Sequence, residues 1–386
     1  MFVKRFLLLI FFLSIVSIQN FSFAEESNEK VIKSNRIDNY EILSISQPGS
    51  LFYSVTNGII KSAINLNSNL TFIGRANVGL EKVIDKNNIE ILTTRKDYLY
   101  SLSIKTIHND VSDLFYSKEV SESLINNEII ISDLTANLYS LTKGDTMFLI
   151  GLNQQEVEVV VGEIIPDSEI GWFEGVVNKD LGYKLGINRN IQAIIWGNKI
   201  TENHLIEIHK NIKYKKIRLT GRDSTPNRNW VLPTALVKEM FGDFQMKERD
   251  GTWITIDRAW KDENIETKNV PILGRITCHR LMWEPLLGAF NQIIEENLQS
   301  GLSREQFKEA GGCYAPRRIN RFDSGGSISR HAWGIAIDIN TKTGYNPRIV
   351  EIFNDWGFAW GGTWTSPDAM HFELRSLSAS ISQANK

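Results

Sequence analysis

Several residue types that often reveal a protein's class are scarce in this chain. Its 386 residues include only two cysteines and six histidines, and its formal net charge is −2. Neither cysteine lies in a CxxC or zinc-finger spacing, which argues against a thiolate metal site. A nearly neutral charge gives no electrostatic reason to expect binding to nucleic acid or to an anionic membrane surface. We therefore expect no nucleic-acid partner, and composition alone names no other.

Long apolar runs are also absent after the first two dozen residues. Lys4 and Arg5 precede an apolar run from Phe6 to Ile18, and Ala24 ends a small-x-small cleavage pattern. The run is shorter than the roughly 20 residues that span a bilayer. We predict a cleaved signal peptide over residues 1–24, an exported protein located in the periplasm or outside the cell, and no stable membrane span after cleavage.

Export bears on the two cysteines, Cys278 and Cys313. In an oxidising compartment an even pair of cysteines usually forms a disulfide. Sequence alone does not place the two within bridging distance, so a bridge and two separate buried thiols are both open.

Length and composition predict two folded parts. Alternating runs such as residues 157–165 (VEVVVGEII) indicate half-buried strands in an N-terminal α+β region of unknown role, residues 25–219. Turn formers open a connecting segment, residues 220–269.

The element order from residue 127 to 165 resembles the extracytoplasmic domains of macrolide-exporter-type ABC permeases, which implies an interaction domain and makes an envelope protein a candidate partner. We assign a C-terminal α+β domain with a small antiparallel sheet flanked by helices to residues 270–376, and a loose tail to residues 377–386.

The stretch SRHAWGIAIDIN, residues 329–340, joins a histidine and an aspartate through a glycine-and-alanine segment. In a strand, Gly334, Ala336 and Asp338 share one face and the isoleucines between them share the other, so the carboxylate has room beside it. A straight strand at about 3.3 Å per residue would hold His331 and Asp338 roughly 23 Å apart. Both reach one ion only if the chain turns sharply, and Gly334 best permits that turn. The alternative is an ordinary strand with a polar entry.

A second segment, SPDAMHFEL, covers residues 366–374. Alternation predicts that Met370, Phe372 and Leu374 face a core while His371 and Glu373 point the other way. Asp368 follows a proline and can approach from a loop. Ligands from residues 331, 338 and 371 would leave the fourth tetrahedral position of a zinc ion to water, as in catalytic sites, and Asp368 would serve as general base.

These segments resemble a known family. SRHAWGIAID fits the S-x-H-x-x-G-x-A-x-D signature of the zinc D-Ala-D-Ala carboxypeptidases and L-alanyl-D-glutamate endopeptidases, which act on peptidoglycan. DAMHFEL resembles the family's closing acid-x-x-His strand, and GFAWGGTW, residues 357–364, resembles the aromatic segment of the endolysin-like branch. The resemblance covers about residues 270–375. It implies Zn²⁺ held by His331, Asp338 and His371, with Asp368, where the family often has Glu, as the catalytic acid/base.

The family also uses an arginine upstream of the first ligand to stabilise an oxyanion or a substrate carboxylate. In GGCYAPRRINRF, residues 311–322, Arg317 is the match and Arg318 the alternative, since a guanidinium suits either role. Glu373 is either a partner of a metal ligand or a solvated strand residue. Trp333, Trp360 and Trp364 either line a cleft or pack in the core.

The resulting hypothesis is an exported zinc metallopeptidase that hydrolyses peptidoglycan stem peptides, as a D-Ala-D-Ala carboxypeptidase or an L-Ala-D-Glu endopeptidase. The alternative is a non-catalytic module that binds the cell wall or an envelope protein on a peptidase fold.

Overall fold

A computed structural model describes residues 42–47, 49–171, 173–197, 202–213, 218–220, 232–249, 252–310, 312–319, 326–340, 344–364 and 367–377. The predicted signal peptide and the predicted tail after residue 377 lie outside the described residues. Among the helices described, none has the length and apolar character needed to cross a membrane.

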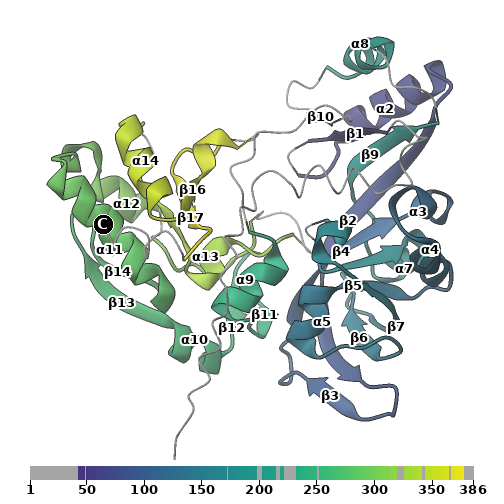
Figure 1. Cartoon of the computed structure of the whole chain (residues 1–386), viewed down its shortest axis with the longest axis horizontal. Helices are drawn as coiled ribbons and strands as arrows, with labels where there is room; N and C mark the ends of the chain where they lie inside the picture. Colours follow the sequence, from purple (N-terminus) through teal and green to yellow (C-terminus); the bar gives the residue numbers. More distant parts are fainter. Residues whose placement is uncertain are drawn as a thin grey trace, which may run out of the picture.

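The N-terminal part is built on a ten-stranded sheet, six of whose strands close into a barrel in the order β2-β4-β8-β5-β7-β6 (Figure 1). Strands β1, β9 and β10 extend the sheet beyond the barrel along the other half of β2, and β3 pairs with β2. The elements are β1 (Leu43–Ser46), α2 (Tyr53–Asn65), β2 (Asn69–Ile84), β3 (Glu90–Thr93), β4 (Tyr100–Ile107), α3 (Asn109–Phe115), α4 (Lys118–Ile125), β5 (Ile129–Ser132), α5 (Asp133–Tyr139), β6 (Thr146–Ile150), β7 (Glu156–Ile165), α6 (Asp167–Ile170), β8 (Gly175–Asn178), α7 (Lys179–Lys184), β9 (Asn190–Trp196), α8 (Glu202–Asn211) and β10 (Arg218–Thr220).

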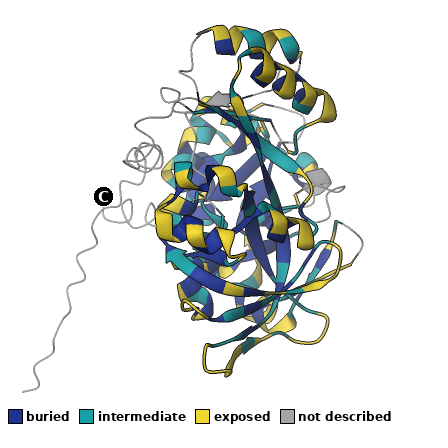
Figure 2. Cartoon of the chain, turned by 90° about the vertical axis from the view of Figure 1, so that its right-hand side faces the viewer, coloured by how far each residue is buried: buried dark blue, intermediate teal, exposed yellow. Residues whose placement is uncertain are grey.

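The barrel closes because β2 is 16 residues long and pairs with β4 and β6. Strands β5 and β8 are buried along their whole length, and β7 alternates over part of its length as the sequence predicts. Figure 2 shows the buried strands as the dark interior, with exposed helix surfaces outside. The predicted α+β character is confirmed, whereas the closure into a barrel was not predicted.

Among its described residues, the C-terminal part contains three small antiparallel sheets, β11-β12, β13-β14 and β15-β17-β16, packed with helices, which agrees with the predicted fold class. Its elements are α9 (Thr234–Phe241), β11 (Met246–Glu248), β12 (Ile254–Ile256), α10 (Arg258–Asn264), β13 (Ile265–Val270), β14 (Gly274–His279), η2 (Arg280–Met282), α11 (Trp283–Glu295), η3 (Gln299–Gly301), α12 (Arg304–Ala310), α13 (Arg330–Trp333), β15 (Ala336–Asp338), α14 (Pro347–Asp355), β16 (Phe358–Trp360), η4 (Gly361–Thr363) and β17 (His371–Leu374).

One hydrophobic core runs through this part from Val237 to Leu374. It includes Phe241 of α9, Ile254 of β12 and Trp260 of α10, all of which lie in the predicted connecting segment. The described residues of that segment therefore add a layer to the C-terminal core. Cys278 and Cys313 form a disulfide within the same core, with their Cα atoms 5.4 Å apart, so the first of the two alternatives holds.

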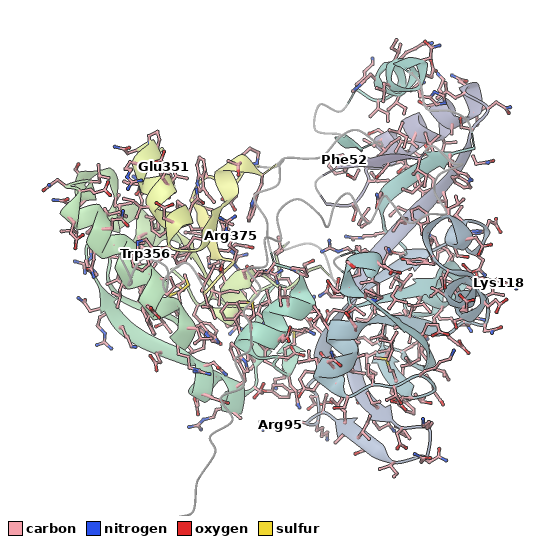
Figure 3. All side chains as sticks on the ribbon, viewed as in Figure 1. Phe52, Arg95, Lys118, Glu351, Trp356 and Arg375 are labelled. Atoms are coloured by element: carbon pink, nitrogen blue, oxygen red, sulfur yellow. A yellow bond between two sulfur atoms is a disulfide. The ribbon has the colours of Figure 1, made fainter. Side chains whose placement is uncertain are left out.

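The two parts meet along α9 and β11, which lie between them in Figure 1. Leu99 and Met246 exchange two backbone hydrogen bonds, of 2.8 and 2.9 Å. Arg95, labelled in Figure 3, donates its backbone N–H to the side chain of Gln245 at 2.8 Å. These bonds join the edge of the barrel directly to the second part.

A buried ion-pair network lies beside these backbone bonds. Lys238 of α9 is 1% exposed, and its Nζ lies 2.8 Å from Glu174 Oε1 in the barrel and 3.3 Å from Asp243 Oδ2. The lysine also donates to the hydroxyl of Tyr139 at 2.9 Å, and that hydroxyl donates to Asp243. Burial alone would lower the pKa of Lys238, but the two carboxylates raise it above its ordinary value. The cation is thus paired across the junction rather than left alone in the interior.

Candidate metal centre

His331 is placed by a single helical turn, α13. Ser329 caps this turn, since its hydroxyl accepts the His331 backbone N–H at 3.3 Å. Gly334 ends the turn in the left-handed region, with φ of 68°. A Cβ on Gly334 would also lie 2.7 Å from the backbone nitrogen of His279. The predicted sharp turn at Gly334 is therefore confirmed, and only glycine fits there without strain.

Asp338 and His371 face one another across two paired strands. Strand β15 pairs antiparallel with β17, and Asp338 lies directly opposite His371 in the register. Ile335, Ile337 and Ile339 are fully buried in the core, as the alternation predicts. One turn and one strand pair thus bring together residues that are far apart in the sequence.

The three predicted metal ligands form one buried cluster. His331, Asp338 and His371 are 1%, 3% and 8% exposed, and one ligand atom from each lies within 4.8 Å of the others. Asp338 Oδ1 is 3.2 Å from His331 Nε2 and 2.9 Å from His371 Nδ1. Ligands held about 2.0–2.1 Å from a tetrahedral Zn²⁺ lie roughly 3.3 Å apart. Both separations from the carboxylate are close to that spacing, and all three ligand atoms lie within 4.8 Å, so these residues could hold a metal ion.

The hydrogen bonds around His331 support the same conclusion. Its Nδ1 lies 2.9 Å from the carbonyl oxygen of Cys313, and because a carbonyl only accepts, Nδ1 carries the hydrogen. In the neutral ring Nε2 is then the acceptor nitrogen, and it lies buried at 3.2 Å from Asp338 Oδ1. Two acceptors facing each other are stabilised by a cation. The donor set of two imidazoles and one carboxylate suits Zn²⁺.

The electrostatics of the cluster are strongly coupled. Burial alone would raise the pKa of Asp338, but hydrogen bonds and charges from His331 and His371 hold it well below its ordinary value. Burial lowers the pKa of His371, but hydrogen bonds to Asp338 and Glu373 outweigh that effect and raise it to about 9. Without a metal, a proton on His371 therefore supplies positive charge beside the carboxylate of Asp338, as a bound metal ion would.

Asp368 lies in the turn that leads into β17. Its backbone N–H donates to Gly361 at 2.9 Å, and its carbonyl accepts from the backbone of His371 at 3.1 Å. Burial raises the pKa of its carboxyl group, and the charge of His371 opposes the rise, with further effects from Asp338, His331 and Arg317. The Asp368 carboxyl group thus interacts electrostatically with all three clustered residues.

The two candidate arginines have different surroundings. Arg318 is 5% exposed and its guanidinium forms an ion pair with Glu248 and donates to the carbonyl of Gly326. Arg317 is half-buried, pairs with Trp253 in a β-bridge, and its charge acts on Asp368. Of the two, Arg317 is the one whose charge reaches the cluster.

One contact at the cluster was not identified from the sequence, and a second was left open between two alternatives. The carbonyl of Cys313 orients His331, and no local pattern predicts a backbone acceptor 18 residues away. The carboxylate of Glu373 lies 3.3 Å from His371 Nε2 and is buried, so the solvated alternative for Glu373 is wrong. Among the tryptophans, Trp333 packs in the core, while the ring of Trp364 lies 5.2 Å from that of His371.

Comparison with known proteins supports a peptidase. Residues 323–374 match the model of a peptidase family whose description is D-alanyl-D-alanine carboxypeptidase. The matched segment contains the three clustered residues and Asp368 but covers only a small share of the chain. No curated protein matches the chain. The C-terminal segment is thus similar to this peptidase family.

Proposed function

We propose that this protein is an exported zinc-dependent peptidase that hydrolyses stem peptides of peptidoglycan, either as a D-Ala-D-Ala carboxypeptidase or as an L-Ala-D-Glu endopeptidase. The observation that carries the proposal is the convergence of His331 Nε2 and His371 Nδ1 on one carboxylate oxygen of Asp338. The similarity of residues 323–374 to a carboxypeptidase family supports the substrate class.

In this proposal His331, Asp338 and His371 hold the zinc ion. A zinc ion bound there would polarise the substrate carbonyl and lower the pKa of a water molecule toward about 7. Asp368 accepts a proton from the attacking water and returns it to the leaving amine, so that one water molecule is consumed for each peptide bond broken. Arg317 stabilises the negative charge that develops on the carbonyl oxygen, because its guanidinium remains charged.

The N-terminal part has a separate role in the proposal. The buried pairing of Lys238 with Glu174 fixes the barrel against the peptidase part. Such a fixed barrel would present its outer surface to an envelope protein while the peptidase part acts on the cell wall.

The test measures zinc content and peptide release together. The mature protein and its His371→Ala variant are purified, their zinc is determined, and peptidoglycan is incubated with each. About one zinc per wild-type chain, with release of D-Ala or of stem fragments and loss of both in the variant, is the expected result. The released product identifies the bond. A metal-free protein that binds peptidoglycan without cutting it would favour the binding module instead.

A further inference from the structure

Glu373 is a buried carboxylate on the outer side of a proposed metal ligand. It is 3% exposed, and its Oε2 lies 3.3 Å from His371 Nε2. The other ring nitrogen, Nδ1, faces Asp338 Oδ1 at 2.9 Å. The two carboxylates therefore lie on opposite edges of one imidazole, and Glu373 is outside the group whose ligand atoms converge.

The sheet leaves space for this side chain through two alanines. Glu373 lies in the central strand β17, directly opposite Ala336 of β15 and Ala359 of β16. Both alanines are fully buried. Directly opposite residues share a face of the sheet, with Cβ atoms about 4.5–5.5 Å apart. A larger side chain at either position would occupy the space beside the glutamate. The small side chain of Ala336 is therefore required by the packing of Glu373.

A cation compensates the buried charge. The guanidinium of Arg330, the residue before the first ligand, is held by the carbonyl of Leu232 and by Thr234 Oγ1 at 3.5 Å. Burial lowers the pKa of this guanidinium, and the charge of Glu373 opposes that effect. The arginine and the buried glutamate therefore interact.

We propose that Glu373 is a positioning residue for the metal centre: it accepts the Nε2–H of His371 and thereby fixes the tautomer whose Nδ1 lone pair is available to a metal ion held together with Asp338. The inference rests on the proposed metal site and adds the residue that orients its third ligand. An acceptor on the outer nitrogen fixes both the ring orientation and the tautomer, and loss of such a partner typically weakens metal binding 10–100-fold.

The test compares Glu373→Gln, which keeps an acceptor oxygen, with Glu373→Leu, which removes it. Zinc dissociation constants are measured on the full chain by competition with a chromophoric chelator, and thermal unfolding of the metal-free proteins reports the fold. The matched control is Glu174→Gln, because Glu174 is also a fully buried carboxylate but lies at the barrel junction.

We expect Glu373→Leu to bind zinc about 10–100-fold more weakly than wild type, and Glu373→Gln to recover most of that loss. The control should lose stability and keep its zinc affinity. Imidazole ¹⁵N shifts of selectively labelled His371 should report a protonated Nε2 in the zinc-bound wild type and in Glu373→Gln.

Unchanged affinity in Glu373→Leu, or equal losses in both Glu373 variants, would overturn the proposal, because the accepted hydrogen bond would then not matter. A wild-type protein that binds no zinc would instead remove the proposed metal site itself. The two failures are therefore distinguishable.

Discussion

Breaking the Cys278–Cys313 disulfide should cost stability without removing the metal site. The bridge closes a loop with a sequence separation of 35, and the chain-entropy relation gives about 3.8 kcal/mol for a loop of that length at 25 °C. With a urea slope of about 2 kcal/mol per M, the unfolding midpoint falls by about 2 M. The perturbation is the double variant Cys278→Ser/Cys313→Ser, or reduction of the wild type, each compared with the oxidised wild type.

Zinc affinity should change much less than stability. Cys313 supplies the carbonyl that orients His331, but two backbone bonds also hold this segment. Tyr314 donates to Thr277 at 2.9 Å, and Ala315 donates to the carbonyl of His331 at 2.9 Å. Because these bonds do not depend on the sulfur atoms, we expect zinc affinity to fall by less than about tenfold, which is less than the typical loss when the hydrogen-bond partner of a metal-binding histidine is removed.

The assay is equilibrium urea unfolding followed by tryptophan fluorescence, which reports mainly the C-terminal part because seven of the ten tryptophans lie between residues 253 and 364. Chelator competition gives the zinc affinity of the same samples. An unfolding midpoint that is the same with and without the bridge would refute the entropy argument. Complete loss of zinc binding in the serine variant would refute the claim that backbone bonds suffice to place the carbonyl.

Three further predictions concern the junction and the site. Lys238→Met should destabilise the protein by about 3–5 kcal/mol at pH 7, because Glu174 is left buried and unpaired, and the loss should shrink at pH 5 as the carboxylate is neutralised; thermal unfolding at both values checks this. Zinc affinity should fall by up to about tenfold per pH unit below pH 9, since the proton on His371, whose pKa is about 9 without metal, competes with the ion; titrations between pH 6 and 9 should show this slope and not a flat profile. Asp368→Asn should lower kcat/KM about 10²–10⁴-fold while zinc content stays the same, and loss of the metal instead would assign the residue to binding.

The sequence determined most of the candidate metal centre because the information for it is local. One segment contains His331, Gly334 and Asp338, and the other contains Asp368 and His371. Each is a short pattern that indicates the local backbone conformation, a turn or a strand. Alternation correctly assigned the isoleucines to the core, and glycine at position 334 indicated the turn that the left-handed φ confirms. These features depend on neighbours within a few residues.

Tertiary structure decided everything that depends on partners distant in sequence. The barrel closes through the pairing of β2 with β6, which no alternation within either strand indicates. The even cysteine pair suggested a bridge, but only the packing of β14 against the segment that contains Cys313 brings the two Cα atoms to 5.4 Å. Alternation placed Glu373 on the face of His371 without deciding between solvent and interior. Glu373 is buried because β15 and β16 flank β17 on both sides and place buried alanines opposite it. The burial of a strand residue depends on the elements that pack around the strand.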